Sequence, residues 1–195
     1  EHIIWWNDDH QLVDSIVRDV SHRRIYCGAD NGIFDAMNKA MKYCKGKYVL
    51  FLNARDTFEQ TFKTEYLDRH GGPCLIRVIY EDFFGREKYV ALKNNLKLGI
   101  PYCHQGMLLE RAKIEFPTNL RFGGDYVALL NCDYNWPLGV LSSGLIRYDT
   151  QGVSSINRWT SDMCTNEIIK NRFGPFWQYV HLMRSIVKLS IKKLY

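Results

Sequence analysis

Residues 48–52 (YVLFL) are apolar at every position, and this run constrains the fold more than any other feature of the chain. A strand with one face in water alternates apolar and polar side chains, whereas a strand covered on both faces is apolar throughout. Helices on both sides of a parallel sheet are the usual cover for such a strand. The run therefore predicts an α/β protein whose sheet lies between helices.

Strands and helices alternate in the sequence that leads to this run. Residues 2–6 and 24–27 are short segments rich in apolar and aromatic side chains, and they predict two strands. Residues 12–20 and 33–44 carry apolar side chains at helical spacing, and they predict two helices. The order strand, helix, strand, helix, strand is typical of a doubly wound, mostly parallel sheet flanked by helices.

The second half of the chain has a different pattern. Residues 74–80 and 88–92 flank a short polar and aromatic connection, and they predict a hairpin-like pair. A helix is predicted to begin at Tyr126 and a further strand to cover residues 140–148. Residues 151–155 then predict a loop. This half adds strands that need not be parallel to the first three.

Polar side chains follow each of the first three predicted strands. They occupy residues 7–9, 30–32 and 53–56. In doubly wound sheets, ligands bind outside the carboxyl ends of the strands. We therefore expect these three clusters to border one binding cleft.

Composition and short motifs exclude several classes of protein. The 26 Lys and Arg against 21 Asp and Glu give a net charge of +5, which favours anionic partners such as phosphates or anionic lipid without requiring nucleic acid. The sequence has no GxSxG motif, so it gives no support to Ser-His-Asp chemistry, and the lack of a GxGxxG or P-loop motif disfavours nicotinamide and ATP sites. It also has no long uncharged run that could span a membrane. Its six cysteines form no CxxC pair, so we expect free thiols in a reducing, cytoplasmic compartment.

Three side chains near the strand ends each have two interpretations. Asp56 follows a buried strand, where a carboxylate either caps the next turn or holds a divalent cation completed by a substrate's phosphates. Asp125 either caps the helix that begins at Tyr126 or acts as a general base. His104 either is structural or, with Gln105, lines a polar subsite. Spacing alone favours the structural interpretation each time.

Two sequence blocks resemble those of a known enzyme family. Residues 30–40 (DNGIFDAMNKA) and 48–58 (YVLFLNARDTF) resemble the GIYDAMNKG and FLNSGDxF blocks of family 2 glycosyltransferases, which are inverting enzymes of the GT-A fold in polysaccharide assembly. Shorter matches are the opening EHII, CHQ at residues 103–105, GDY at 124–126 and GVSS at 152–155. The likeness extends over residues 1–156, and it implies a GT-A fold.

The resemblance also implies roles for individual residues. Asp125 matches the general base, and Asp56 matches the last aspartate of the DxD motif, which binds Mn²⁺ or Mg²⁺ at the diphosphate of the donor. His104 and Gln105 match an acceptor-side position. The positions assigned to donor binding are Asn7, Asp30, Asp35, Asn38 and Asn53.

The chain departs from the family pattern at three places. Ala54 stands where many relatives have the first Asp of DxD, so one carboxylate is missing. Residues 5–10 replace the usual VDGGSTDGT loop. The family's first strand has no counterpart before Glu1, so we expect the natural protein to have further N-terminal residues. We predict a GT-A domain over residues 1–173 that lacks this strand, followed by a basic amphipathic helix over residues 174–195.

The predicted tail helix has an apolar side and a basic side. The apolar side carries Phe176, Val180, Met183, Val187 and Leu194. The basic side carries His181, Arg184, Lys188 and Lys192. The helix either docks on the domain with its basic side in water or lies on an anionic membrane through residues 175–195.

Taken with the resemblance, the sequence predicts a metal-dependent inverting glycosyltransferase. It would move a hexosyl or deoxyhexosyl group from a nucleotide-diphosphate sugar to a glycan or glycolipid acceptor, in the cytoplasm or at the membrane periphery. Two other functions are compatible with the sequence. One is a degenerate GT-A domain that binds nucleotide sugar or glycan without turnover, which Ala54 favours. The other is a membrane-surface module built around the tail.

Overall fold

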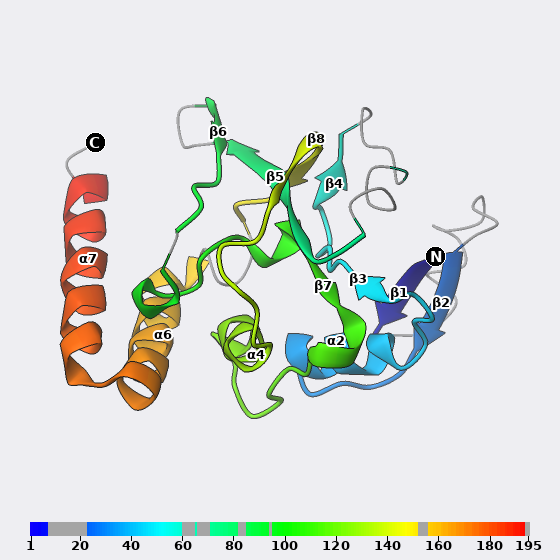
Figure 1. Cartoon of the computed structure of the whole chain (residues 1–195), viewed down its shortest axis with the longest axis horizontal. Coiled ribbons are helices and arrows are strands. Elements are labelled where there is room, and N and C mark those ends of the chain that lie inside the picture. Colours follow the sequence, from blue (N-terminus) through cyan, green and yellow to red (C-terminus); the bar gives the residue numbers. More distant parts are fainter. Residues whose placement is uncertain are drawn as a thin grey trace.

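The computed structural model describes residues 1–7, 23–59, 65, 71–81, 85–93, 95–151 and 156–193 (Figure 1). Its strands are β1 (His2–Trp6), β2 (Arg23–Cys27), β3 (Tyr48–Val49), β4 (Thr57–Phe58), β5 (Cys74–Glu81), β6 (Glu87–Tyr89), β7 (Met107–Glu110) and β8 (Val140–Tyr148). Its α-helices are α2 (Ile33–Met41), α4 (Gly124–Asn131), α6 (Arg158–Phe173) and α7 (Pro175–Lys193), and its 3-10 turns are η1 (Leu96–Leu98), η2 (His104–Gly106) and η3 (Arg111–Lys113). The predicted helix over residues 12–20 and the loop over residues 152–155 lie outside the described residues.

The described strands form two sheets. β1 and β2 pair in parallel, from His2 opposite Arg23 to Trp6 opposite Cys27. The larger sheet has the order β3–β7–β5–β8–β4, and β6 also pairs with β5. Within it β5 and β8 are parallel and the other pairings are antiparallel, so the prediction that the sheet is mostly parallel is wrong for this larger sheet. The predicted pair of residues 74–80 and 88–92 is the antiparallel β5–β6 pair, because so short a connection can only reverse the chain.

The strand buried on both faces is β5. Cys74, Leu75 and Ile76 are fully buried, and β5 lies in the sheet between β8 on one side and β6 and β7 on the other. The run over residues 48–52, which was predicted to be such a strand, pairs only over Tyr48–Val49. Residues 50–52 then pack half-buried against the core on their way to the turn at residues 53–56. Their apolar character reflects this packing rather than a long parallel ladder.

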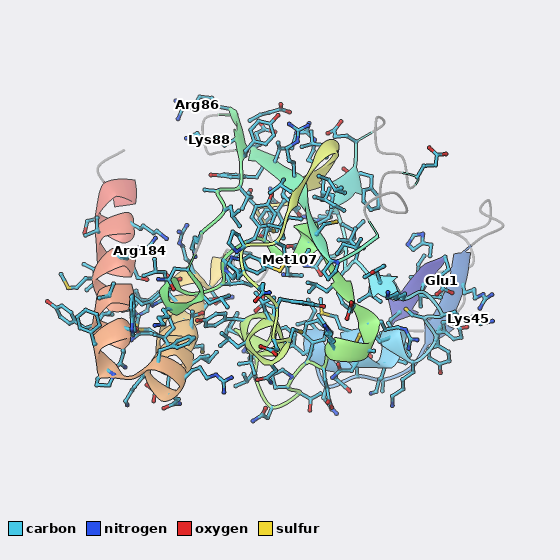
Figure 2. The ribbon with its side chains drawn as sticks, in the orientation of Figure 1. Glu1, Lys45, Arg86, Lys88, Met107 and Arg184 are labelled. Atoms are coloured by element: carbon cyan, nitrogen blue, oxygen red, sulfur yellow. The ribbon has the colours of Figure 1, made fainter. Side chains whose placement is uncertain are left out.

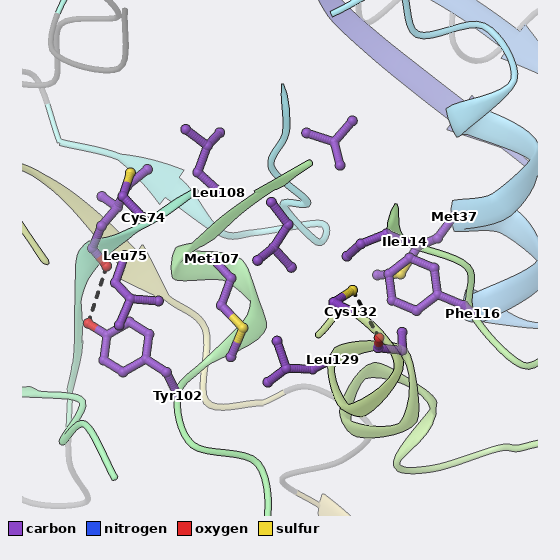
Figure 3. Close-up of a cluster of buried hydrophobic side chains, with 14 of the residues drawn as sticks. Met37, Cys74, Leu75, Tyr102, Met107, Leu108, Ile114, Phe116, Leu129 and Cys132 are labelled. Atoms are coloured by element: carbon purple, nitrogen blue, oxygen red, sulfur yellow. Dashed lines mark hydrogen bonds between the residues drawn. The ribbon is translucent and has the colours of Figure 1, made fainter. Parts of the chain in front are cut away.

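The core joins α2 and α4 to the edge of the sheet (Figure 3). The predicted apolar side of α2 is buried through Met37 and Met41, and Phe116 packs against Phe34 of the same helix. The side chain of Asn38 fastens α2 in place, because its amide donates to the Phe116 carbonyl at 2.7 Å and accepts from the Phe116 N–H at 3.0 Å. These contacts fix the N-terminal end of α2 beside the cleft described below.

The turn η2 is held against β5 by a buried tyrosine. The Tyr102 hydroxyl donates to the Ile76 carbonyl at 3.2 Å (Figure 3). It also accepts from the Val78 N–H at 3.1 Å. Gly106 lies in the same contact, and a Cβ placed on it would meet the Val78 side chain at 2.5 Å and the Ile76 carbonyl at 2.6 Å. A glycine is therefore required for η2 to approach β5 this closely.

Two helices complete the described chain. α6 was not predicted from the sequence, whereas α7 forms within the predicted tail. The two helices pack side by side after a turn at Gly174, whose φ of 90° suits a glycine (Figure 1). Among the described residues, no helix has the length and apolar character needed to cross a membrane.

Candidate active site

A cleft of about 1190 Å³ lies where several predicted polar clusters meet. Its walls come from the N-terminal end of α2, the turn after β3, the turn η2, the start of α4 and the end of β8. Six of the nine predicted site residues line this cleft, namely Asp35, Asn53, Asp56, His104, Gln105 and Asp125. Residues from widely separated parts of the sequence thus share one cavity.

Asp125 and His104 face each other in the cleft. Asp125 lies in the first turn of α4, where the helix dipole favours a carboxylate. Its Oδ1 accepts the N–H of Tyr126 at 2.9 Å, and its Oδ2 lies 3.4 Å from His104 Nδ1. The two side chains are 22% and 21% exposed, so a substrate can reach them while most of their surface is protected. This pair can accept a proton from a hydroxyl group in the cleft.

Asp56 closes the turn that follows β3. Its Oδ2 accepts the N–H of Asn53 at 3.1 Å, so it does cap the turn, as spacing alone had favoured. Its Oδ1 accepts the N–H of Asp149 at 2.9 Å, which ties the turn to the end of β8. Each oxygen keeps a further lone pair for a ligand, because a carboxylate oxygen can accept two hydrogen bonds. The capping and ligand-binding interpretations are therefore compatible.

Sequence reasoning missed Asp149, which brings a second carboxylate to this turn. Asp149 directly follows β8 and lines the cleft. Its Oδ2 lies 3.7 Å from Arg55 Nη1, and its Oδ1 accepts the N–H of Gln151 at 2.9 Å. The signal that could have found it is the one used for residues 53–56, a polar side chain at the end of an apolar strand.

Asp30 lies behind the cleft wall, where it is hydrogen-bonded to β1, to the residue that follows β1 and to the start of α2. Its Oδ2 accepts the indole N–H of Trp5 at 3.2 Å, and its Oδ1 accepts the N–H of Gly32 at 3.0 Å. Its own N–H donates to Asn7 Oδ1 at 3.3 Å. Trp5 and Gly32 line the cleft, whereas Asp30 and Asn7 do not. The network therefore shapes this end of the cleft through β1 and the start of α2.

Asp35 is a charged group in the first turn of α2. Its Oδ2 accepts from Lys39 Nζ at 2.7 Å and from the N–H of Asn31 at 2.9 Å. The hydrogen bond from Lys39, followed by that from Asn31, lowers the pKa of this carboxyl. Asp35 is therefore ionised at neutral pH and lines the cleft as an acceptor of hydrogen bonds.

Two other predicted site residues form hydrogen bonds with other residues of the chain. The Asn38 amide is bonded to the backbone of Phe116, and Asn38 does not line the cleft. Gln105 lines the cleft but is only 2% exposed, and its Oε1 lies 2.7 Å from the Cys103 thiol. Burial raises the pKa of the Cys103 thiol to about 12, so this thiol stays protonated and can donate. The substrate-binding roles of Asn38 and Gln105 stay predictions.

The metal that the resemblance implies would have to bind with few protein ligands. No group of three or more His, Cys, Asp or Glu side chains within the described part of the chain is arranged to hold a metal ion. Mg²⁺ and related cations often bind through one or two carboxylates together with substrate phosphates. Asp56, whose Oδ1 accepts the backbone N–H of Asp149, fits that mode of binding. It does not fit a site built from protein ligands alone.

Comparison with solved structures defines the fold. The chain is similar to S. aureus TarS, with a TM-score of 0.54, 17% identity, and coverage of 87% of this chain and 56% of TarS. For TarS in complex with UDP-GlcNAc the TM-score is 0.54, at 17% identity, with coverage of 75% and 49%. For the complex with UDP it is 0.51, at 17% identity, with coverage of 87% and 56%. The chain thus spans about half the length of these TarS chains.

This likeness shows an α/β fold of the GT-A type, as the sequence predicted. No protein-family model matches the sequence, and no curated protein sequence matches it.

Proposed function

We propose that this chain is a metal-assisted inverting glycosyltransferase of family 2 that uses a nucleotide-diphosphate sugar. One observation carries the proposal: Asp125 and Asp56, about 70 residues apart, line the same cleft in a fold of the GT-A type. TarS, which has a similar fold, binds UDP and UDP-GlcNAc in its crystal structures. A nucleotide sugar is therefore the donor class that we assign to this cleft.

Asp125 is the proposed general base. It would take the proton from an acceptor hydroxyl while that oxygen attacks the anomeric carbon, and the nucleoside diphosphate would leave from the opposite face of the sugar. The contact with His104 orients the Asp125 carboxylate, which lies in the first turn of α4. Attack opposite to the leaving group inverts the configuration at the anomeric carbon.

Asp56 is the proposed residue on the diphosphate side. It would hold Mn²⁺ or Mg²⁺ jointly with the diphosphate of the donor, with Asp149 as its neighbour. When bound, such a cation stabilises the negative charge that develops on the leaving group. Arg55 lies 3.7 Å from Asp149 and adds a positive charge at the same turn. The donor would therefore lie with its diphosphate at this turn and its sugar toward Asp125.

A second function is a GT-A domain that binds a nucleotide sugar or glycan without turnover. The observation that favours it is Ala54, which removes one carboxylate from the turn at residues 53–56. The two functions differ in one property, since only the enzyme releases nucleoside diphosphate from the donor.

An assay of nucleotide release tests the proposal. We expect the chain, supplied with Mn²⁺ and a panel of UDP-, GDP- and dTDP-sugars, to release nucleoside diphosphate from one donor and to stop when EDTA removes the metal. NMR spectroscopy of the product should show the anomeric configuration opposite to that of the donor. Binding of a donor with no release of nucleoside diphosphate, with or without candidate acceptors, would support the non-catalytic domain instead.

A further inference from the structure

The outer face of α7 is an apolar ridge formed by Phe176, Tyr179, Met183, Ile186 and Val187. These five side chains are 68%, 62%, 42%, 41% and 51% exposed, respectively. Their spacing of three and four residues places them on one side of the helix. No described part of the chain covers them, although large apolar side chains gathered on one face usually mark an interaction site.

The opposite face of α7 is the one that packs on the protein. His181 is 7% exposed and Ser185 is 4% exposed, and His181 Nδ1 lies 3.3 Å from the Asn166 side chain of α6. One of the two predictions for this helix was that it docks through its apolar side and leaves its basic side in water. That prediction is therefore wrong. The structure places part of the basic side against the domain and leaves the apolar ridge in water.

Positive charge lies between the ridge and the side of α7 that packs on the protein. Each residue of a helix is turned by about 100° from the one before it, so Arg184 and Lys188 lie to one side of Met183 and Val187. Arg184 lies on the side of α7 that faces α6, and its Nη1 is buried without a hydrogen-bond partner in the described structure (Figure 2). Over its whole length α7 has four Lys and Arg and no Asp or Glu. The helix therefore combines exposed apolar surface with unbalanced positive charge.

Two further cations extend this positive region beyond α7. Burial first, and then the charges of Lys188 and Arg184, lower the pKa of Lys93 to about 8. Arg158, at the start of α6, also contributes to this lowering, and the negative charge of Asp162 opposes it. None of the four cations forms an ion pair within 4 Å with a described carboxylate. An external anion at the exposed side chain of Lys188 would relieve the repulsion among them.

We propose that α7 lies flat on an anionic phospholipid membrane, with the apolar ridge in the acyl boundary and the cations of α7 at the level of the lipid phosphates. An exposed apolar face together with cations and no acidic residue is the pattern of helices that bind in the membrane interface. A second copy of the chain fits less well, because symmetric pairing of the two helices would bring their positive charges together.

Vesicle binding by the 195-residue chain tests this proposal. We expect sedimentation with vesicles of equal parts phosphatidylcholine and phosphatidylglycerol, little with phosphatidylcholine alone, and weaker binding at high salt. Arg184→Gln and Lys188→Gln should each weaken binding about fivefold. The double variant Met183→Ser/Val187→Ser should weaken it about tenfold or more, because less apolar surface enters the lipid.

Matched controls separate the ridge from general surface effects. Ile156→Ser removes an exposed apolar side chain elsewhere, and Lys42→Gln removes an exposed cation, so both should bind like the wild type. Because ridge side chains are exposed, the ridge variant should keep the circular dichroism spectrum of the wild type, and Phe176→Ser replaces it if it does not. Equal binding by wild type and ridge variant, or concentration-dependent dimerisation through the ridge without vesicle binding, would overturn the proposal.

Discussion

Asp125→Asn should reduce turnover by about 10²–10⁴-fold, the usual contribution of a general base. The variant keeps the shape of the side chain and an oxygen that can accept the N–H of Tyr126, but it cannot take a proton from an acceptor hydroxyl. Donor affinity should change little, because the proposed diphosphate contacts are at Asp56. Steady-state kinetics of nucleotide release, with the donor and acceptor varied in turn, measure this effect.

Asp133→Asn is the matched control for the loss of one carboxylate. Asp133 is exposed, does not line the cleft, and has a φ of 35°, a backbone conformation that asparagine also adopts. We expect wild-type kinetics from this control. Near-normal turnover by a correctly folded Asp125→Asn variant would show that Asp125 is not the base.

Gly106→Ala should destabilise the protein by about 3 kcal/mol, at the upper end of the range for overpacking. The added Cβ would meet the Val78 side chain at 2.5 Å, the Ile76 carbonyl at 2.6 Å and the Tyr102 ring at 2.8 Å. Two of these neighbours belong to the buried strand β5, so they have little room to move. Urea denaturation followed by fluorescence measures the change in the free energy of unfolding.

Gly72→Ala is the control for the general effect of replacing a glycine. A Cβ on Gly72 would meet nothing within 4 Å, so the change in stability should be small. Turnover should fall with Gly106→Ala and not with Gly72→Ala, because η2 also carries His104. Equal stability of the two variants would mean that η2 does not press against β5 as described.

Much of the fold could be predicted from the sequence, because the corresponding segments have clear apolar periods. β1, β2, α2, β8 and α7 all form where apolar spacing predicted them, and the β5–β6 pair follows from its short connection. The helix α6 could not be found in this way. It buries only Asn166 and Ile169 among its described side chains, so its sequence has almost no apolar face for a periodicity argument to detect.

The cleft was predictable in its position and less so in its details. Because ligands bind at the carboxyl ends of strands, the sequence predicts that Asn53 and Asp56 border a binding cleft. The structure places both residues in the cleft. Hydrogen-bond partners such as Phe116 for Asn38 come from residues distant in the sequence, and no local pattern reveals them. The outward direction of the apolar side of α7 likewise depends on α6, which was not predicted.

Calorimetric titration with UDP, GDP and dTDP, with and without Mn²⁺, tests most directly whether this cleft is a nucleotide-sugar site. The comparison is between the wild type and Asp56→Asn, which removes the charge that would hold the cation. We expect that one nucleoside diphosphate binds the wild type, that this binding requires Mn²⁺, and that the variant loses it. Absence of binding to a folded wild-type chain, or equal binding by both proteins irrespective of metal, would contradict it.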